Sequence, residues 1–365
     1  MTMTAQDARH MARALYLARR GLYTTDPNPR VGCVIARKDV VLGEGWHERA
    51  GGPHAEVVAL REAEGNSLHD VTAYVTLEPC SHHGRTPPCS QTLIKAKVKR
   101  VVVAMKDPNP LVSGQGLADL KAAGITVAMG LMETEARALN PGYVYRMETG
   151  RPWVRVKLAA SLDGRTALAN GQSQWITGAP AREDVQCLRA RASAILTGVS
   201  TILHDDPSLN VRRFEIGRQP LRVVLDSTLR LSPDARLLKL EGKTLIVTAS
   251  EDHDRMLALQ QAGAEVLHVA TSGHRIDLKT LMTDLVAREI NELHVEAGAT
   301  LCGALLHEGL VNELVLYLAP HLMGAHARGM FNFPGLESMD ERVRLIIKDV
   351  RAVGEDWRIT ADVRH

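Results

Sequence analysis

The alternation of short apolar segments with amphipathic segments is the feature that most restricts how this chain can fold. TAYVTLEP, RVVVAMKD and ITVAMG have the character of buried strands, and SQTLIKAK, GLADLKAAG and METEARALN between and after them favour helices. This order predicts an α/β fold with helices on both faces of a mostly parallel sheet. Because 365 residues exceed the usual size of one hydrophobic core, we expect two domains.

A break in the periodicity separates two such units. Around NPGYVYRMETGRPW, prolines and glycines interrupt the pattern, so we expect a domain boundary near residues 146–152, with domains over residues 1–148 and 149–365. The alternation then resumes. Its expected strands are WVRVKLAAS, AILTG, LRVVLD, TLIVTAS, EVLHVA, ELHVEAG and ELVLYLAP.

Charge and cysteine content exclude several classes of protein. Lys and Arg together number 44 and Asp and Glu 42, and the lack of a basic stripe speaks against a nucleic-acid partner. Five cysteines are too few for a disulfide scaffold and fit a reducing compartment, so we expect a cytoplasmic protein.

The N-terminal segment has no continuous apolar core, which excludes a secretory signal or membrane span there. It predicts an amphipathic helix with one face made of Ala8, Met11, Leu15 and Ala18.

The strongest chemical pattern consists of His54, Glu56, Cys80 and Cys89. HAE opens an expected helix, and EPCSHHGRTPPC follows an expected strand. Zinc deaminases use His-x-Glu followed by Pro-Cys and a later Cys, in which the Glu moves protons and does not bind the metal. One histidine and two thiolates leave the fourth position of zinc open for water, as catalysis requires.

Two features of this segment leave alternatives open. Eight residues separate the two cysteines, where the short-spacing signature has two. His82 and His83 lie in that loop, and either is a substrate contact, a surface residue or a fourth ligand that would make the site structural. The rival hypotheses are therefore a nucleic-acid base deaminase with a non-catalytic second domain and a zinc-stapled interaction module. Three other cysteines stand in apolar runs and are expected to be buried: Cys33, Cys187 and Cys302.

Several motifs make the sequence resemble the bifunctional riboflavin-biosynthesis deaminase–reductase family over nearly the whole chain. They are TTDPNPRVGCVI, GGPHAE, YVTLEPCSHHGRTPPC, DPNP, KLAASLDGRTA, SQWIT, DDPSLNVR and VEAGATLCGALL. The long cysteine spacing is the pattern of that family. The resemblance implies a cytidine-deaminase-like three-layer N-terminal domain and a dihydrofolate-reductase-like C-terminal domain. It also implies two reactions on a phosphoribosylated pyrimidine, a hydrolytic deamination and an NADPH-dependent reduction of the ribosyl chain, in a homo-oligomer, most simply a dimer.

The resemblance also implies roles for individual residues. His54, Cys80 and Cys89 bind one zinc ion per chain, and Glu56 is the proton donor. NADPH is assigned to Ala159, Trp175, Thr201, Asp205, Ser227, Gly298, Ala299, Thr300, Leu301, Cys302, Gly303 and Ala304. The substrate of the reduction is assigned to Ser173, Arg189, Leu209, Arg212 and Glu296, and we add Lys157 on chemical grounds.

The residues of the second half carry less information without the family. There is no G-x-G-x-x-G, and the turn at Gly298, with a helix start whose N–H groups can face an anion, is a weak signal by itself. Arg189 and Arg212 suit a ribose phosphate because a guanidinium binds it with two hydrogen bonds. We infer from its charge that Lys157 polarises the sugar carbonyl.

Overall fold

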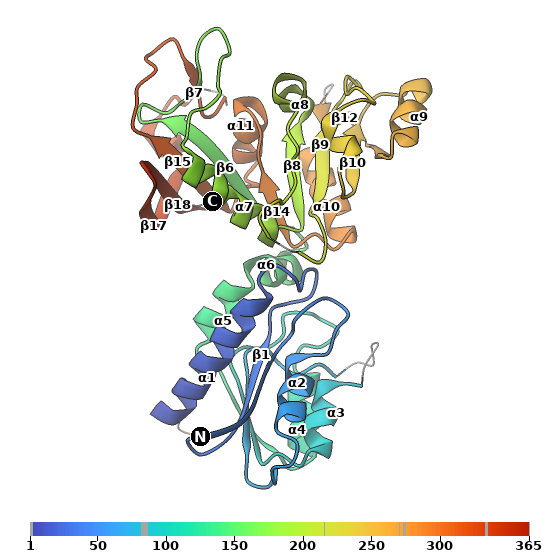
Figure 1. Cartoon of the computed structure of the whole chain (residues 1–365), viewed down its shortest axis with the longest axis vertical. Helices are drawn as coiled ribbons and strands as arrows, with labels where there is room; N and C mark the ends of the chain where they lie inside the picture. Colours follow the sequence, from blue (N-terminus) through green and yellow to red (C-terminus); the bar gives the residue numbers. More distant parts are fainter. Residues whose placement is uncertain are drawn as a thin grey trace. The chain divides into compact units, whose positions relative to one another are not determined.

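Two separate sheets organise the chain in the computed structural model, which describes residues 3–81, 87–214, 216–269, 271–272, 275–332 and 335–364. The chain divides into two compact units, residues 1–150 and 151–365, and each unit contains one of the sheets (Figure 1).

The first unit is built on a five-stranded sheet in the order β2-β1-β3-β4-β5. β1 and β2 form an antiparallel hairpin, and β3, β4 and β5 run parallel to one another. Its strands are β1 (Gly32–Arg37), β2 (Val40–Trp46), β3 (Thr72–Val75), β4 (Arg100–Val103) and β5 (Thr126–Met129). Its helices are α1 (Ala5–Ala18), η1 (Arg19–Gly21), α2 (Ala55–Glu62), α3 (Cys89–Lys95), α4 (Gln115–Ala122), α5 (Glu133–Leu139) and α6 (Pro141–Thr149).

Both faces of this sheet are buried, as the sequence predicts. Successive residues of a strand point to opposite faces, so in β1 Val34 and Ala36 enter one core and Cys33 and Ile35 enter the other. The first core is covered by α1, α5 and α6, and the second by α2, α3 and α4, so that helices flank the sheet on both sides (Figure 1). This is the three-layer arrangement expected for the N-terminal domain.

The helix α6 was not expected from the sequence. Pro141 and Gly150 indicated an interruption, yet Pro141 occupies the first turn of α6, where a missing N–H removes no intrahelical hydrogen bond. Gly150 has a φ of 67°, the left-handed conformation that commonly ends a helix. The two residues therefore delimit a helix, and the interruption of the pattern lies only at its ends.

A buried carboxylate anchors the N-terminal helix to the sheet. Asp7 in α1 is 2% exposed and accepts hydrogen bonds from Tyr74 Oη at 2.9 Å and Arg100 Nη1 at 2.7 Å. It also completes a capping box with Thr4. Burial raises the pKa of Asp7, but the bonds from Arg100 and its other donors outweigh this and lower the pKa to about 2. Asp7 is thus a structural carboxylate, ionised at neutral pH.

The second unit is built on a nine-stranded sheet in the order β11-β10-β9-β8-β14-β6-β15-β18-β17. Its long strands are β6 (Trp153–Ser161), β8 (Ala194–Gly198), β9 (Leu221–Leu225), β10 (Thr244–Thr248), β11 (Glu265–His268), β14 (Glu292–Val295), β15 (Glu313–Ala319), β17 (Arg344–Val353) and β18 (Asp356–Arg364). Two small ladders are formed by β7 (Arg165–Ala167) with β16 (Arg328–Gly329) and by β12 (Thr271–Ser272) with β13 (Arg275–Ile276). The helices are α7 (Ala179–Arg191), α8 (Val199–Asp205), η2 (Arg236–Lys239), α9 (His253–Gln261), α10 (Leu278–Ala287), α11 (Ala299–His307) and η3 (Met339–Glu341).

The strands from β11 to β15 are parallel, and β18 and β17 add an antiparallel edge that the alternating pattern did not predict. α10 and α11 pack on one face of the parallel part, and α7, α8 and α9 pack on the other. In the seven parallel strands the carboxyl ends therefore meet at one edge of the sheet. Ligands of open α/β sheets bind at such an edge.

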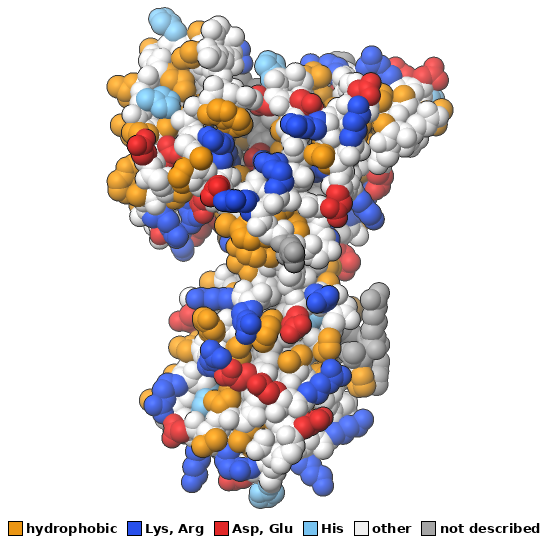
Figure 2. All heavy atoms as spheres, viewed as in Figure 1, with side chains coloured by type: hydrophobic (Ala, Val, Ile, Leu, Met, Phe, Trp, Pro, Cys, Tyr) orange, Lys and Arg blue, Asp and Glu red, His pale blue; other side chains and the backbone are white. Residues whose placement is uncertain are grey.

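Charged side chains of both signs are distributed over the visible face of each unit (Figure 2). None of the helices in the described part of the chain combines the length and the apolar character needed to cross a bilayer.

Candidate functional site

Three potential metal ligands from distant parts of the sequence meet in the first unit. His54 is the N-cap of α2, Cys80 lies in the turn after β3, and Cys89 is the first residue of α3. His54 Nδ1 is 3.1 Å from Cys89 Sγ and 3.6 Å from Cys80 Sγ. All three ligand atoms lie within 4.8 Å of one another.

The size and chemistry of this cluster fit zinc. A tetrahedral ion with a Zn–N bond of about 2.0 Å and a Zn–S bond of about 2.3 Å holds its nitrogen and sulfur ligands about 3.5 Å apart. The two measured N–S distances bracket that value. The backbone N–H of Cys89 donates to Cys80 Sγ at 3.4 Å. Together with a hydrogen bond from the Cys89 side chain, the largest cause, it lowers the pKa of the Cys80 thiol, which favours the thiolate form that zinc binds.

Glu56 lies beside the cluster and outside the ligand set. It occupies the first turn of α2, two residues after His54, and is 3% exposed. Burial raises the pKa of its carboxyl, and the neighbouring His54 opposes this shift. A carboxyl whose pKa is raised towards neutrality both accepts and donates a proton readily, which is what an acid–base residue requires.

Two residues that were given no role from the sequence, Asn28 and His47, support the segment that leads to His54. Asn28 Nδ2 lies 3.0 Å from His47 Nε2, and His47 Nδ1 lies 2.9 Å from the carbonyl of Pro53. The ring of His47 is buried and meets the ring of His54 edge-on, with centroids 5.5 Å apart. His47 therefore holds the turn that presents His54. Only the motif TTDPNPRVGCVI, which contains Asn28, gave a signal for this pair, because His47 lies in none of the family motifs.

The remaining histidines and cysteines of the sequence analysis divide into three groups. His82 and His83 lie outside the described residues. Cys33 and Cys302 are fully buried, as expected, whereas Cys187 is only partly buried. All five cysteines are free thiols.

In the second unit, the expected cofactor residues gather at the carboxyl ends of neighbouring parallel strands. Gly198 ends β8 and caps α8, which carries Thr201 and Asp205. Gly298 follows β14 and is the N-cap of α11, which contains residues 299–304, and a glycine has no side chain to cap the first-turn N–H groups. Ser227 follows β9, and Ala159 lies on β6. Helix starts at strand ends are suited to the phosphates of a dinucleotide such as NADPH.

The structure brings three of the expected substrate residues into one charged cluster. Arg189 on α7 binds Glu296, which follows β14, through two bonds of 2.5 and 2.9 Å. Lys157 on β6 has its ammonium 5.9 Å from the ring centroid of Tyr317 and within range of the charges of this pair. Burial lowers the pKa of the ammonium, and Glu296 opposes the shift. Burial raises the pKa of Glu296, but Arg189 outweighs it and holds that pKa well below its usual range. The buried His294, not singled out by the sequence, lies with Nε2 3.3 Å from Glu296 Oε1.

Loop residues complete this region to different extents. Asn210 joins the two arginines: its backbone carbonyl accepts a hydrogen bond from Arg189 Nη1, and its side-chain oxygen accepts one from Arg212 Nη1. Gln174 donates to Asp205 at 3.0 Å, so the loop carrying Ser173 and Trp175 is tied to α8. Trp175 is 71% exposed, and the guanidinium of Arg182 lies 4.6 Å from its ring centroid. Leu209, in contrast, is buried in the hydrophobic core, which leaves its backbone as the group able to contact a substrate.

Comparison with known proteins assigns both units. The RibD C-terminal domain matches residues 152–359, and the cytidine and deoxycytidylate deaminase zinc-binding region matches residues 4–105. The riboflavin biosynthesis protein RibD of Escherichia coli (strain K12) is 51% identical over 96% of this chain and 98% of its own length. RibD of Acinetobacter baumannii superposes with a TM-score of 0.91 at 46% identity, with 99% of both chains covered.

A third relative carries a descriptive name. The Thermotoga maritima diaminohydroxyphosphoribosylaminopyrimidine deaminase/5-amino-6-(5-phosphoribosylamino)uracil reductase is 31% identical, with a TM-score of 0.87 over 98% of this chain and 99% of its own. These relatives favour neither a nucleic-acid base deaminase nor a zinc-stapled interaction module. From its two matched domains and its full-length relatives, the chain belongs to the RibD family of riboflavin biosynthesis proteins.

Proposed function

We propose that this chain catalyses two steps of riboflavin biosynthesis. The first is hydrolytic deamination of 2,5-diamino-6-(5-phosphoribosylamino)pyrimidin-4(3H)-one. The second is NADPH-dependent reduction of the ribosyl chain of 5-amino-6-(5-phosphoribosylamino)uracil to ribityl. We assign the deaminase to residues 1–148 and the reductase to residues 149–365. The observation that supports the proposal is the cluster of His54, Cys80 and Cys89, with the buried Glu56 two residues from His54, in a chain that matches both RibD domains.

In the deaminase, the residues of the chain divide the work. His54, Cys80 and Cys89 hold zinc, which, when bound, is a Lewis acid that makes water nucleophilic at neutral pH. Glu56 takes a proton from the attacking water and delivers it to the amine nitrogen of the ring. The carbon–nitrogen bond then breaks, and the amine leaves as ammonia. Because Glu56 is buried beside the ligands, it needs little movement between the two transfers.

In the reductase, NADPH, when bound, would supply a hydride to C1 of the ribosyl group. The bond between this carbon and the ring oxygen breaks, and the oxygen takes up a proton, which gives the ribityl chain. Lys157 directs its ammonium to the sugar oxygen and stabilises the negative charge that develops there. Glu296 and Arg189 bind each other, and the negative charge of Glu296 favours the ammonium form of Lys157. Arg212, close to Arg189 and more exposed, is placed to bind the ribose phosphate.

Supplying the two reactants separately tests this proposal. Purified protein given the diaminopyrimidine phosphate without NADPH should release ammonia and accumulate the deaminated compound, because hydrolysis needs only zinc and water. Adding NADPH should then consume the intermediate with stoichiometric NADPH oxidation. Ammonia and NADPH absorbance are followed in the same sample. Ammonia release that required NADPH would contradict two independent sites.

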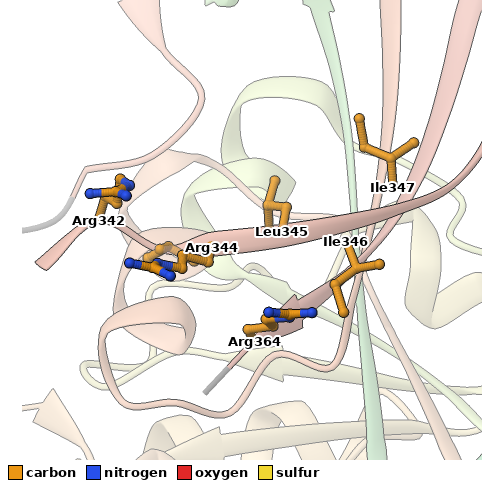
Figure 3. A pocket seen from close by; sticks show the side chains of 7 residues that line it. Arg342, Arg344, Leu345, Ile346, Ile347 and Arg364 are labelled. Atoms are coloured by element: carbon orange, nitrogen blue, oxygen red, sulfur yellow. The ribbon is translucent and has the colours of Figure 1, made fainter. Parts of the chain in front are cut away.

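We further propose a homodimer formed through β17. This strand is the last of the sheet, so one side of its backbone has no neighbouring strand in the described part of the chain. Its Leu345, Ile347 and Val350 are 42%, 62% and 50% exposed. With Arg342 and Arg364 nearby, the strand lines an open groove of about 780 Å³ that contains none of the expected site residues (Figure 3). Antiparallel pairing of β17 with β17 of a second chain would cover this edge in both chains of a symmetric dimer.

A charged residue in the strand tests the dimer. Wild-type protein is expected to have twice the mass of one chain in light scattering, and Ile347→Lys is expected to have the mass of a monomer, because a lysine on an edge strand opposes pairing. Leu257→Lys, at an exposed leucine of α9, is the control and should remain a dimer. An Ile347→Lys protein that stays dimeric would place the interface elsewhere.

We place the protein in the cytoplasm because all five cysteines are free. A thiolate-ligated zinc site is also best preserved where thiols stay reduced. An oxidising compartment would favour a disulfide between Cys80 and Cys89, whose sulfurs both face His54 Nδ1.

A further inference from the structure

The carboxylate of Glu78 is buried beside the proposed zinc site and is used by neither reaction. It lies two residues before Cys80 and is 3% exposed. Its own N–H donates to the carbonyl of Met105 at 3.0 Å. A charged group is removed from water only at a large free-energy cost unless it is well hydrogen-bonded, so its partners indicate its role.

Those partners are backbone N–H groups, two of them at the start of α4 and one in the loop before it. Gly114, the N-cap residue, donates to Glu78 at 2.9 Å, and Leu117 in the first turn donates at 3.3 Å. Asp107, in the loop before the helix, donates at 3.2 Å. A helix start carries free N–H groups and a partial positive charge, which a carboxylate satisfies. Glu78 therefore fastens α4 to the turn that contains Cys80.

α4 also contacts the segments that carry the two cysteines. A Cβ atom at Gly116 would lie 1.9 Å from the carbonyl oxygen of Pro79, so the helix backbone packs directly against the residue before Cys80. Asp119, one turn later, accepts a hydrogen bond from Ser90 Oγ at 3.3 Å, beside Cys89. The N–H of Ser90 in turn donates to the carbonyl of Cys80 at 3.2 Å.

We infer that Glu78 is a positioning residue for the zinc site and acts through α4 to set the separation of the two thiolates. The inference rests on the proposed zinc ligands. Binding of a metal is strongest when the ligands are already held at the correct spacing, and groups that orient the ligands affect affinity nearly as strongly as the ligands themselves. The Pro79–Cys80 turn has no regular secondary structure of its own. Its rigidity therefore comes from the hydrogen bonds that Glu78 accepts from Gly114, Leu117 and Asp107, which we call the clamp.

Glu78→Gln tests the clamp with almost no change in size. The amide NH2 group would face backbone N–H donors, and part of the hydrogen bonding of Gly114, Leu117 and Asp107 is lost. We expect zinc to bind about 10- to 100-fold more weakly, measured on the full chain by competition with a chromophoric chelator. The cobalt(II)-substituted protein should show shifted ligand-field and thiolate charge-transfer bands. NADPH oxidation with the deaminated substrate should not change.

Two further variants separate positioning from general stability. Gly116→Ala favours helix formation, yet its methyl group must push α4 away from Pro79, so it should also weaken zinc binding. Asp7→Asn removes another buried carboxylate of the same unit, and it should lower the thermal stability while leaving the zinc affinity and the cobalt spectrum as in wild type.

The outcomes distinguish the hypotheses. Wild-type zinc affinity in both Glu78→Gln and Gly116→Ala would overturn the inference, as would an equal loss of affinity in Asp7→Asn. Wild-type protein that binds no zinc would instead overturn the proposed ligands.

Discussion

Replacing Glu56 by Gln is expected to reduce ammonia release by about 1,000-fold while zinc stays bound. Glutamine has nearly the same size, so the ligands His54, Cys80 and Cys89 keep their arrangement. An amide does not carry a proton at neutral pH, however, and positioned acid–base groups contribute factors of about 10² to 10⁴. Ammonia release is measured with the diaminopyrimidine phosphate, and zinc is measured by elemental analysis of the same preparation.

Two controls make this result specific. Glu64→Gln, at an exposed carboxylate just beyond α2, removes the same charge away from the site and should leave deamination unchanged. The Glu56→Gln protein should also oxidise NADPH at the normal rate when given 5-amino-6-(5-phosphoribosylamino)uracil, because every proposed reductase residue lies in the second unit. Near-normal deamination by Glu56→Gln would mean that the zinc site is structural.

Replacing Lys157 by Met should have the opposite pattern, with NADPH oxidation reduced about 100- to 1,000-fold and ammonia release unchanged. Methionine fills a similar volume but has no charge for the sugar oxygen, and loss of one group that stabilises developing charge costs a factor of this size. The Arg189–Glu296 pair remains intact, so the pocket should keep its shape. NADPH oxidation is measured with the deaminated substrate, and ammonia release with the diamino compound.

The matched control for this variant is Lys239→Met, at an exposed lysine of the same unit that pairs only with Asp234 in the described contacts. It changes the net charge equally and should leave both activities intact. If Lys157→Met kept a normal kcat and changed only KM, Lys157 would bind the sugar without stabilising the developing charge.

The zinc site illustrates what local pattern is able to predict. His54 and Glu56 lie two residues apart at a helix start, and that spacing places the proposed ligand and the proposed proton carrier close together. Strands and helices with clear periodicity, such as β6 and α1, were likewise predicted, because the period of the apolar residues follows from the geometry of a strand or a helix. The family motifs extended over nearly the whole chain and so indicated both domains.

Features that depend on distant residues were missed. Pro141 and Gly150 read as breakers, although their positions at the two ends of α6 favour that helix. β17 and β18 add an antiparallel edge, which an alternation of strands and helices does not predict. Leu209 is buried in the core because of residues that pack around it from other segments. Each depends on packing between segments, which apolar periodicity does not record.

The chain's own pattern of residues thus determined the α/β class, the zinc chemistry and which side chains we propose as ligands, because these follow from side-chain chemistry and short-range spacing. Only the tertiary structure decided how far apart the ligands stand and which groups hold them there. The bonds from Glu78 to Gly114 and Leu117, and the approach of Lys157 to Arg189 and Glu296, join residues that are far apart in sequence. Such distances are set by strand register and helix packing over the whole unit.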